Sequence, residues 1–184
     1  MVASLRAPSQ VRRVWIITFE LSGVVKVGGL GEAVSLVAHE LSRRGLEVTV
    51  LMPSHGVCPQ GFRELGVGCS GVRRGIDGRE YRYDLILLEG YVGGVRAVLV
   101  GGKPGAGRSS VDSWPPYSYV EEKACLLARV SRCLAQVYGY PGLVHANDWH
   151  AALAASVLKV DAEQRGYALP VLYQVHLRGS PSYP

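Results

Sequence analysis

The sequence predicts an α/β fold built on an open, mainly parallel sheet with helices on both faces. Short apolar runs rich in β-branched residues alternate with segments of helical periodicity. The chain has 184 residues, about the length of one domain. Its hydrophobic share of 48% supplies enough apolar side chains for a sheet buried on both sides.

The first part of the chain is typical of a strand, a glycine-rich turn, a helix and a second strand. Residues 14–19 form an apolar run, and residues 23–31 are rich in glycine. Apolar residues then recur at helical spacing as far as Leu41, and Gly45 is a stop signal. Residues 48–52 form the next apolar run. Such a unit joins two parallel strands by a right-handed crossover.

The middle of the chain has a different pattern. Asp77 and Gly78 are typical of a hairpin turn between two strands. Residues 84–89 and 95–100 are predicted to be further strands. A long loop is expected over residues 101–116.

The last third returns to alternating helices and strands. Ser118 and Glu121 match a capping box, which predicts the start of a helix that ends at Gly139. A strand, a helix and a strand are then expected in this order: residues 143–146, 149–159 and 171–175. This alternation predicts one Rossmann-like layer arrangement.

Composition and charge argue against several classes of protein. No apolar run reaches the roughly 18 residues of a membrane span, and no hydrophobic stretch precedes the N-terminal arginines, so we expect a cytoplasmic protein without a membrane partner. The net charge is +5, but the basic residues occur singly or in pairs. Without a basic stripe we expect no nucleic-acid partner. A mild positive charge suits a small anionic ligand.

Neither the cysteines nor the histidines are spaced as metal ligands. His145, His150 and His176 do not share the spacing of ligands on one helix, so we expect no metal. The cysteines lack CxxC spacing, and we expect them to be small, buried apolar side chains. A disulfide is expected only in an unusual intracellular setting. They are Cys58, Cys69, Cys125 and Cys133.

Polar residues follow four of the predicted strands at their carboxyl ends. They are residues 20–31, 54–56 and 147–150, and His176. In open α/β sheets, ligands bind beyond the carboxyl ends of the strands. The sequence therefore predicts a ligand site at this edge of the sheet.

The most informative of these segments is KVGGLG at residues 26–31. Glycines let backbone amides approach a ligand closely, and the N-terminus of the following helix favours an anion. Lys26 adds a positive charge. The spacing is that of neither a dinucleotide fingerprint nor a Walker loop. The alternative is a tight turn that carries an exposed lysine.

Residues 102–109 nearly spell a phosphate-binding P-loop, with Arg108 in the place of the lysine. A P-loop opens directly into a helix, whereas Trp114 and two prolines follow here. We therefore predict a mobile surface loop. Two other candidates have structural alternatives: Asp148 is suited to cap the helix that starts beside it, and His176 is suited to a structural role at a strand end.

Taken together, these residues resemble the glycogen and starch synthases, retaining glycosyltransferases with two Rossmann-like domains. Residues 20–34 are similar to the family's K-x-G-G-L motif, and residues 48–56 resemble the end of its second strand. Residues 144–150, VHANDWH, resemble the V-H-x-H-D-W-H motif. The order and spacing also fit, and the likeness covers nearly the whole chain.

The chain departs from the family at three points. Asn147 stands where a histidine is usual, and Leu177 follows His176 where bacterial and plant members usually have asparagine, which looks closer to archaeal-type members. The third departure is length: we expect the family's second domain, which holds most of the nucleotide site, to lie outside these 184 residues. We therefore expect residues 1–184 to be an N-terminal Rossmann-like glycosyltransferase domain of the starch synthase catalytic type, inactive without the C-terminal nucleotide-binding domain.

The resemblance implies that the complete enzyme transfers glucose from ADP-glucose or UDP-glucose to the 4-hydroxyl of an α-1,4-glucan, with retention and without a metal or other cofactor. Lys26 and the amides of Gly28 and Gly29 would contact the diphosphate of the nucleotide sugar. His176 would hydrogen-bond the transferred glucosyl unit, and Asp148 would lie near the sugar or the acceptor. These two are the implied catalytic residues.

Two other functions stay open. One is another two-domain glycosyltransferase, of a sucrose-synthesising or glycolipid type. The other is a non-catalytic carbohydrate-binding module that kept only the first domain. A second domain encoded downstream would exclude the module, and assays with alternative acceptors would separate the transferases.

Overall fold

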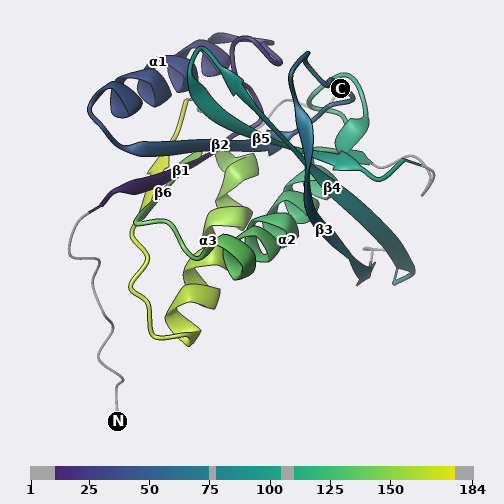
Figure 1. The fold of residues 1–184 in the computed structure, drawn as a ribbon. Coiled ribbons are helices and arrows are strands. Elements are labelled where there is room, and N and C mark those ends of the chain that lie inside the picture. Colours follow the sequence, from purple (N-terminus) through teal and green to yellow (C-terminus); the bar gives the residue numbers. More distant parts are fainter. Residues whose placement is uncertain (1–10, 75–77, 105–109, 177–184) are drawn as a thin grey trace.

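The computed structural model describes residues 11–74, 78–104 and 110–176, which form a seven-stranded sheet with helices on both faces (Figure 1). The elements are β1 (Arg13–Ile17), α1 (Gly29–Arg43), β2 (Glu47–Pro53), β3 (Arg63–Arg74), β4 (Glu80–Val92), β5 (Val95–Gly102), the short 3-10 helix η1 (Ser110–Asp112), α2 (Val120–Tyr138), β6 (Leu143–Asn147), α3 (Trp149–Gln164) and β7 (Val171–Gln174). The strand order is β3-β4-β5-β2-β1-β6-β7.

The sheet is mainly parallel. Strand β1 pairs in parallel with β2 and β6, β2 pairs with β5, and β6 pairs with β7. Strand β4 runs antiparallel to both β3 and β5. The predicted fold class is confirmed, and so is the hairpin, because Arg74 pairs with Glu80. Its predicted turn residue Asp77 lies outside the described residues.

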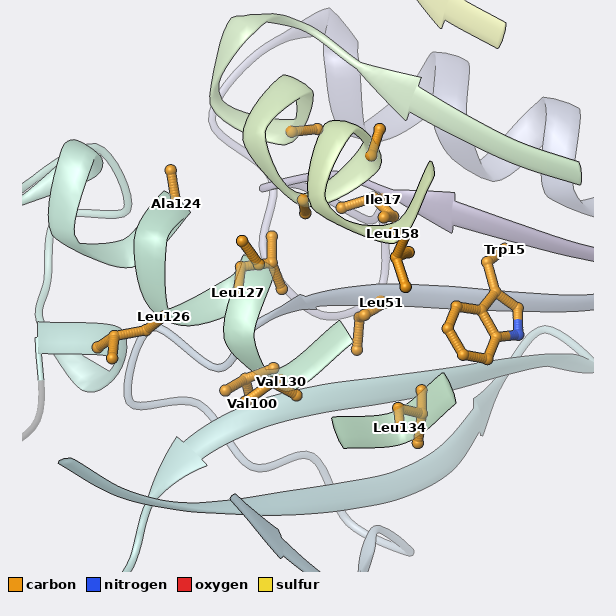
Figure 2. Close-up of a cluster of buried hydrophobic side chains, with 14 of the residues drawn as sticks. Trp15, Ile17, Leu51, Val100, Ala124, Leu126, Leu127, Val130, Leu134 and Leu158 are labelled. Carbon is orange, nitrogen blue, oxygen red and sulfur yellow. The ribbon is translucent and has the colours of Figure 1, made fainter. Parts of the chain in front are cut away.

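Helix α1 lies on one face of the sheet, and α2 and α3 lie on the other (Figure 1). Strand β1 packs against helices on both faces of the sheet: Ile16 packs with residues of α1, and Ile17 packs with residues of α2 and α3. Strand residues that are buried on both faces explain why this strand is a continuous apolar run. Figure 2 shows side chains of the second layer: Trp15, Ile17, Leu51 and Val100 from the strands, and Leu127, Val130, Leu134 and Leu158 from the helices. Within the described ranges, no helix combines the length and apolarity needed to cross a membrane.

The predicted capping box before α2 is wrong. The helix begins at Val120, and the residue at its N-cap is Tyr119, whose φ is 50°. Ser118 directs its hydroxyl to the carbonyl of Pro115 at 2.7 Å instead of to the helix. A serine hydroxyl can satisfy a turn as readily as a helix end, so the motif alone does not decide between them.

A disulfide joins Cys69 of β3 to Cys133 of α2, so the expectation of unpaired cysteines is wrong for this pair. Cys58 and Cys125 are free thiols, but Cys58 is exposed and Cys125 only partly buried, so neither is the buried side chain that was expected. Helix α2 packs across β3, which brings together two cysteines that lie 64 residues apart in sequence. Short spacing motifs carry no information about such long-range pairs.

We predict that Cys133→Ser lowers the free energy of unfolding under oxidising conditions. Opening a cross-link across 64 residues returns loop entropy to the unfolded chain, worth about 4 kcal/mol. The melting temperature should fall by about 10 °C, and reductant should reproduce the loss in the unmodified chain. The exposed thiol of Cys58 provides the control: Cys58→Ser should change neither result. An equal melting temperature for Cys133→Ser and the unmodified chain would contradict the prediction.

Candidate functional site

The carboxyl ends of β1, β2, β6 and β7 meet at one edge of the sheet because these strands are parallel neighbours. Polar side chains that are at most 2% exposed gather there: Thr18, Glu20, Ser54, His55, Asn147, Asp148 and His150. Polar side chains of this kind are mostly exposed, and the charged ones are almost never fully buried unless they are paired. This concentration marks the edge as the candidate site.

Two residues at this edge have backbone conformations that favour glycine. His55, after β2, has a φ of 53°, and Asp148, after β6, has a φ of 62°. Non-glycine residues in this region cost about 1–3 kcal/mol each and cluster at functional sites. The surrounding contacts therefore hold both side chains in place against a backbone preference.

A buried carboxylate supports the glycine turn before α1. Glu20 accepts the N–H groups of Val27 at 2.7 Å and Gly28 at 2.9 Å, and it accepts the hydroxyl of Tyr117. Burial alone would raise the pKa of Glu20. The hydrogen bonds from Gly28, Tyr117, Val27 and Gly31 together lower it by more, so the net pKa is below its ordinary value. The side chain is therefore an anion at neutral pH.

The turn itself is accessible to a ligand. Lys26 is exposed and pairs with Glu32, a contact that is worth little at the surface. Gly28 is the N-cap of α1 and Gly29 is its first residue, with open space where a side chain would stand at either position. The N–H of Gly28 is engaged by Glu20. The positive end of the helix dipole lies at the same place.

A second buried charge fixes the loop that precedes α2. Lys123 is 0% exposed, and its ammonium donates to the carbonyls of Ser113 and Pro116, both at 2.8 Å, and to Nδ1 of His55 at 3.0 Å. The other ring nitrogen of His55 donates to the carbonyl of Phe19 at 3.0 Å. Burial and the charge of Lys123 lower the pKa of His55 to about 4. The imidazole is therefore neutral at pH 7.

The strand ends of β6 and β7 are joined by side chains. His176 donates its backbone N–H to Asp148 Oδ1 at 2.7 Å, and its Nε2 donates to Asn147 Oδ1 at 2.9 Å. Asp148 occupies the N-cap position of α3, but its side chain makes no capping hydrogen bond. Asn147, the departure from the family pattern, thus contacts the histidine that the sequence singles out.

His150 lies beneath this edge. Its ring is 4.2 Å from that of Phe19 and 5.7 Å from that of Tyr117, measured between centroids. Neither ring nitrogen has a hydrogen-bond partner within the described part of the chain. Burial lowers the pKa of His150 to about 4, against the attraction of Asp148 and Glu20 for its charged form.

The structure places the predicted site residues in two groups on one edge. Asp148 and His176 are in direct contact. The turn residues reach them through intermediates: Gly28 binds Glu20, Glu20 binds Tyr117, and Tyr117 lies against the ring of His150 on α3. No group of three histidine, cysteine or acidic side chains among the described residues is placed to hold a metal.

Sequence reasoning missed two residues of this site. Tyr117 follows two prolines in a loop, where no periodicity indicates its direction. Lys123 did carry a signal, because it lies on the apolar face of α2 between Val120 and Leu127. Of the P-loop-like segment, residues 105–109 lie outside the described residues; Lys103, beside them, pairs with Asp84 of β4.

In open α/β sheets ligands bind beyond the carboxyl ends of the strands, and the glycine turn, Asp148 and His176 lie at this edge. The family model of the starch synthase catalytic domain matches residues 13–179. The chain therefore belongs to this family of glycosyltransferases.

Individual relatives agree with the family. The chain is 35% identical over 164 residues to glycogen synthase of Thermus thermophilus and 31% identical over 179 residues to that of Pseudomonas aeruginosa. These alignments cover 89% and 92% of this chain but 32% and 33% of the relatives, so the chain spans about a third of their length. Both relatives are bacterial and give no support to the expectation of an archaeal-type member.

The fold is also that of a solved structure. The catalytic domain of starch synthase IV from Arabidopsis thaliana, bound to ADP and acarbose, has a TM-score of 0.72 with this chain. The match covers 91% of this chain and 34% of the solved one, at 22% sequence identity. It shows a shared fold.

We predict that acid destabilises the chain through its buried histidines. An unfolded histidine takes up a proton below pH 6.5, whereas His150 does so only near pH 4, so stability is complete above pH 6.5 and falls as the pH drops towards 4. His150 alone accounts for about 3 kcal/mol of this loss. His150→Phe should reduce the difference between urea midpoints at neutral and acid pH.

The exposed His39 provides the control, and His39→Asn should retain the acid loss of the unmodified chain. An acid loss that is equally large in His150→Phe would contradict the prediction.

Proposed function

We propose that the chain is the N-terminal domain of a glycogen or starch synthase. The complete enzyme would transfer glucose from a nucleotide sugar to the 4-hydroxyl at the end of an α-1,4-glucan, with retention. The family match over residues 13–179 carries this proposal, together with the position of Lys26 at the N-terminus of α1. The length of the relatives supports a second domain that completes the cleft.

The turn before α1 would bind the diphosphate of the donor. A helix N-terminus favours an anion, and Lys26 can exchange its exposed partner Glu32 for a phosphate oxygen. Gly29 would supply the amide contact. Gly28 already donates its N–H to Glu20, so a direct contact from Gly28 would require that hydrogen bond to be shared or broken.

The other group of residues would hold the sugar. His176 and Asp148 are the proposed contacts of the glucosyl unit and its acceptor, and their mutual hydrogen bond fixes one relative to the other. As the bond between the sugar and the diphosphate breaks, negative charge grows on the diphosphate, and Lys26 would stabilise this charge. The chain alone would leave Lys26 facing solvent, so we expect it not to transfer glucose.

A transfer assay tests the proposal. The longer protein that contains this chain is incubated with glycogen and labelled ADP-glucose or UDP-glucose, with ADP-glucose tested first because the solved relative is bound to ADP. We expect label in α-1,4-linked glucan. Transfer to a sugar phosphate or a lipid instead would favour the sucrose- or glycolipid-type alternative, and transfer to no acceptor would favour a binding module.

We predict that Lys26→Ala in the complete enzyme lowers kcat by about 10²–10³. The contact strengthens as charge develops on the leaving group, so kcat should fall far more than the KM for glucan rises. Lys103→Ala is the matched control, because Lys103 is also an exposed, ion-paired lysine and lies beside the P-loop-like segment. An effect on kcat from Lys103→Ala but not from Lys26→Ala would place the phosphate elsewhere.

A further inference from the structure

We infer that Glu20 is a positioning residue for the donor phosphate: its buried carboxylate holds the turn before α1 and ties it to the loop that carries Tyr117. This role rests on the proposed function. The role explains why a carboxylate lies beside the proposed anion site, where a second negative charge is otherwise unfavourable.

The backbone N–H groups at the start of α1 support this role, because Glu20 is close to some of them and not to others. A helix leaves its first N–H groups without an intrahelical acceptor, here those of residues 28–31. Glu20 accepts the N–H of Gly28 at 2.9 Å, and the Gly31 amide lies near enough to lower the pKa of the same carboxylate. Gly29 and Leu30 therefore remain for a ligand. The carboxylate and the phosphate would use different amides of the same helix end.

The two oxygens of Glu20 serve different elements. Oε2 accepts the amides of Val27 and Gly28, whereas Oε1 accepts the hydroxyl of Tyr117, which lies 97 residues further along the chain. Glutamine at this position would keep the size but would offer only one acceptor oxygen. Its oxygen can still accept the turn amides while its NH2 group donates to the Tyr117 oxygen, but the contacts lose the charge of the carboxylate and the Tyr117 hydroxyl loses its acceptor.

The Tyr117 loop is itself anchored, so the attachment is rigid at both ends. Lys123 binds the carbonyls of Ser113 and Pro116 in this loop and also contacts the ring of His55. His55 in turn donates to the carbonyl of Phe19, the residue before Glu20. The hydrogen bonds thus form a closed path, which resists movement of the Glu20 carboxylate from both sides.

The position of Gly31 beside Glu20 agrees with this arrangement. A Cβ at Gly31 would lie 3.4 Å from Cβ of Glu20 and 3.5 Å from its Oε2. These are ordinary van der Waals distances, so the first turn of the helix lies directly against the Glu20 side chain. By contrast, Gly28 and Gly29 face open space on the ligand side.

Amide hydrogen exchange on the 184-residue chain tests the anchoring. Glu20→Gln should raise the exchange rates of the Val27, Gly28 and Gly31 amides about tenfold or more, because each hydrogen bond to the carboxylate is weakened. Tyr117→Phe should produce a smaller rise. Glu40→Gln is the matched control on the same helix, since Glu40 pairs with the side chains of the exposed Arg43 and Arg44.

Kinetics of the complete enzyme test the positioning. Glu20→Gln should lower kcat about tenfold or more, with the KM for glucan within about twofold of the unmodified enzyme. Glu20→Asp, which restores the second oxygen, should recover part of the loss. Normal kcat per folded enzyme together with a lowered melting temperature would overturn the inference, and so would unchanged exchange at Val27 and Gly28.

The two experiments also separate this inference from the proposed function. An unmodified complete enzyme that transfers no glucose would overturn the proposed function and the donor role of Glu20 with it. Faster exchange in Glu20→Gln would even then support Glu20 as the anchor of the turn.

Discussion

The candidate site depends on one constraint, the parallel pairing of β2, β1, β6 and β7. Neighbouring parallel strands end at the same edge of the sheet, so the segments that follow them lie close together even when they are far apart in sequence. The register aligns Ile17 of β1 with Leu51 of β2 and with Ala146 of β6. The residues that follow each strand are consequently placed within reach of one another. Burial on both faces of the sheet keeps this edge fixed.

Two buried charged side chains hold the loops at this edge of the sheet in place. Glu20 organises the turn at the start of α1, and Lys123 organises the loop before α2. Burying a charge is costly unless hydrogen bonds compensate it, and both side chains have several. Tyr117 and His55 connect the two charges through short contacts. The buried side chains at this edge are thus joined by hydrogen bonds, whereas Lys26 is exposed to solvent.

Local patterns predicted the fold class and the helices and placed Asp148 and His176 at strand ends, because alternating apolar runs and parallel topology determine both. Strand β3 was predicted only where it enters the hairpin, although it begins at Arg63. The disulfide between Cys69 and Cys133 could not be predicted, since it depends on how α2 crosses β3. The N-terminus of α2 was missed because its serine bonds within the preceding turn. Lys123 could have been found, as a lone charge on an apolar helix face.

The central claim is that the turn before α1 is the phosphate site, and binding of ADP to the isotope-labelled chain tests it most directly. Amide chemical shifts are followed by NMR as ADP is added to the chain and to Lys26→Ala. An exposed lysine and one helix end bind phosphate weakly, so the account predicts small shifts at high ADP concentrations, centred on Lys26, Gly29 and Leu30, and their loss in Lys26→Ala. Shifts centred instead on residues 102–104, or shifts that persist unchanged in Lys26→Ala, would contradict it.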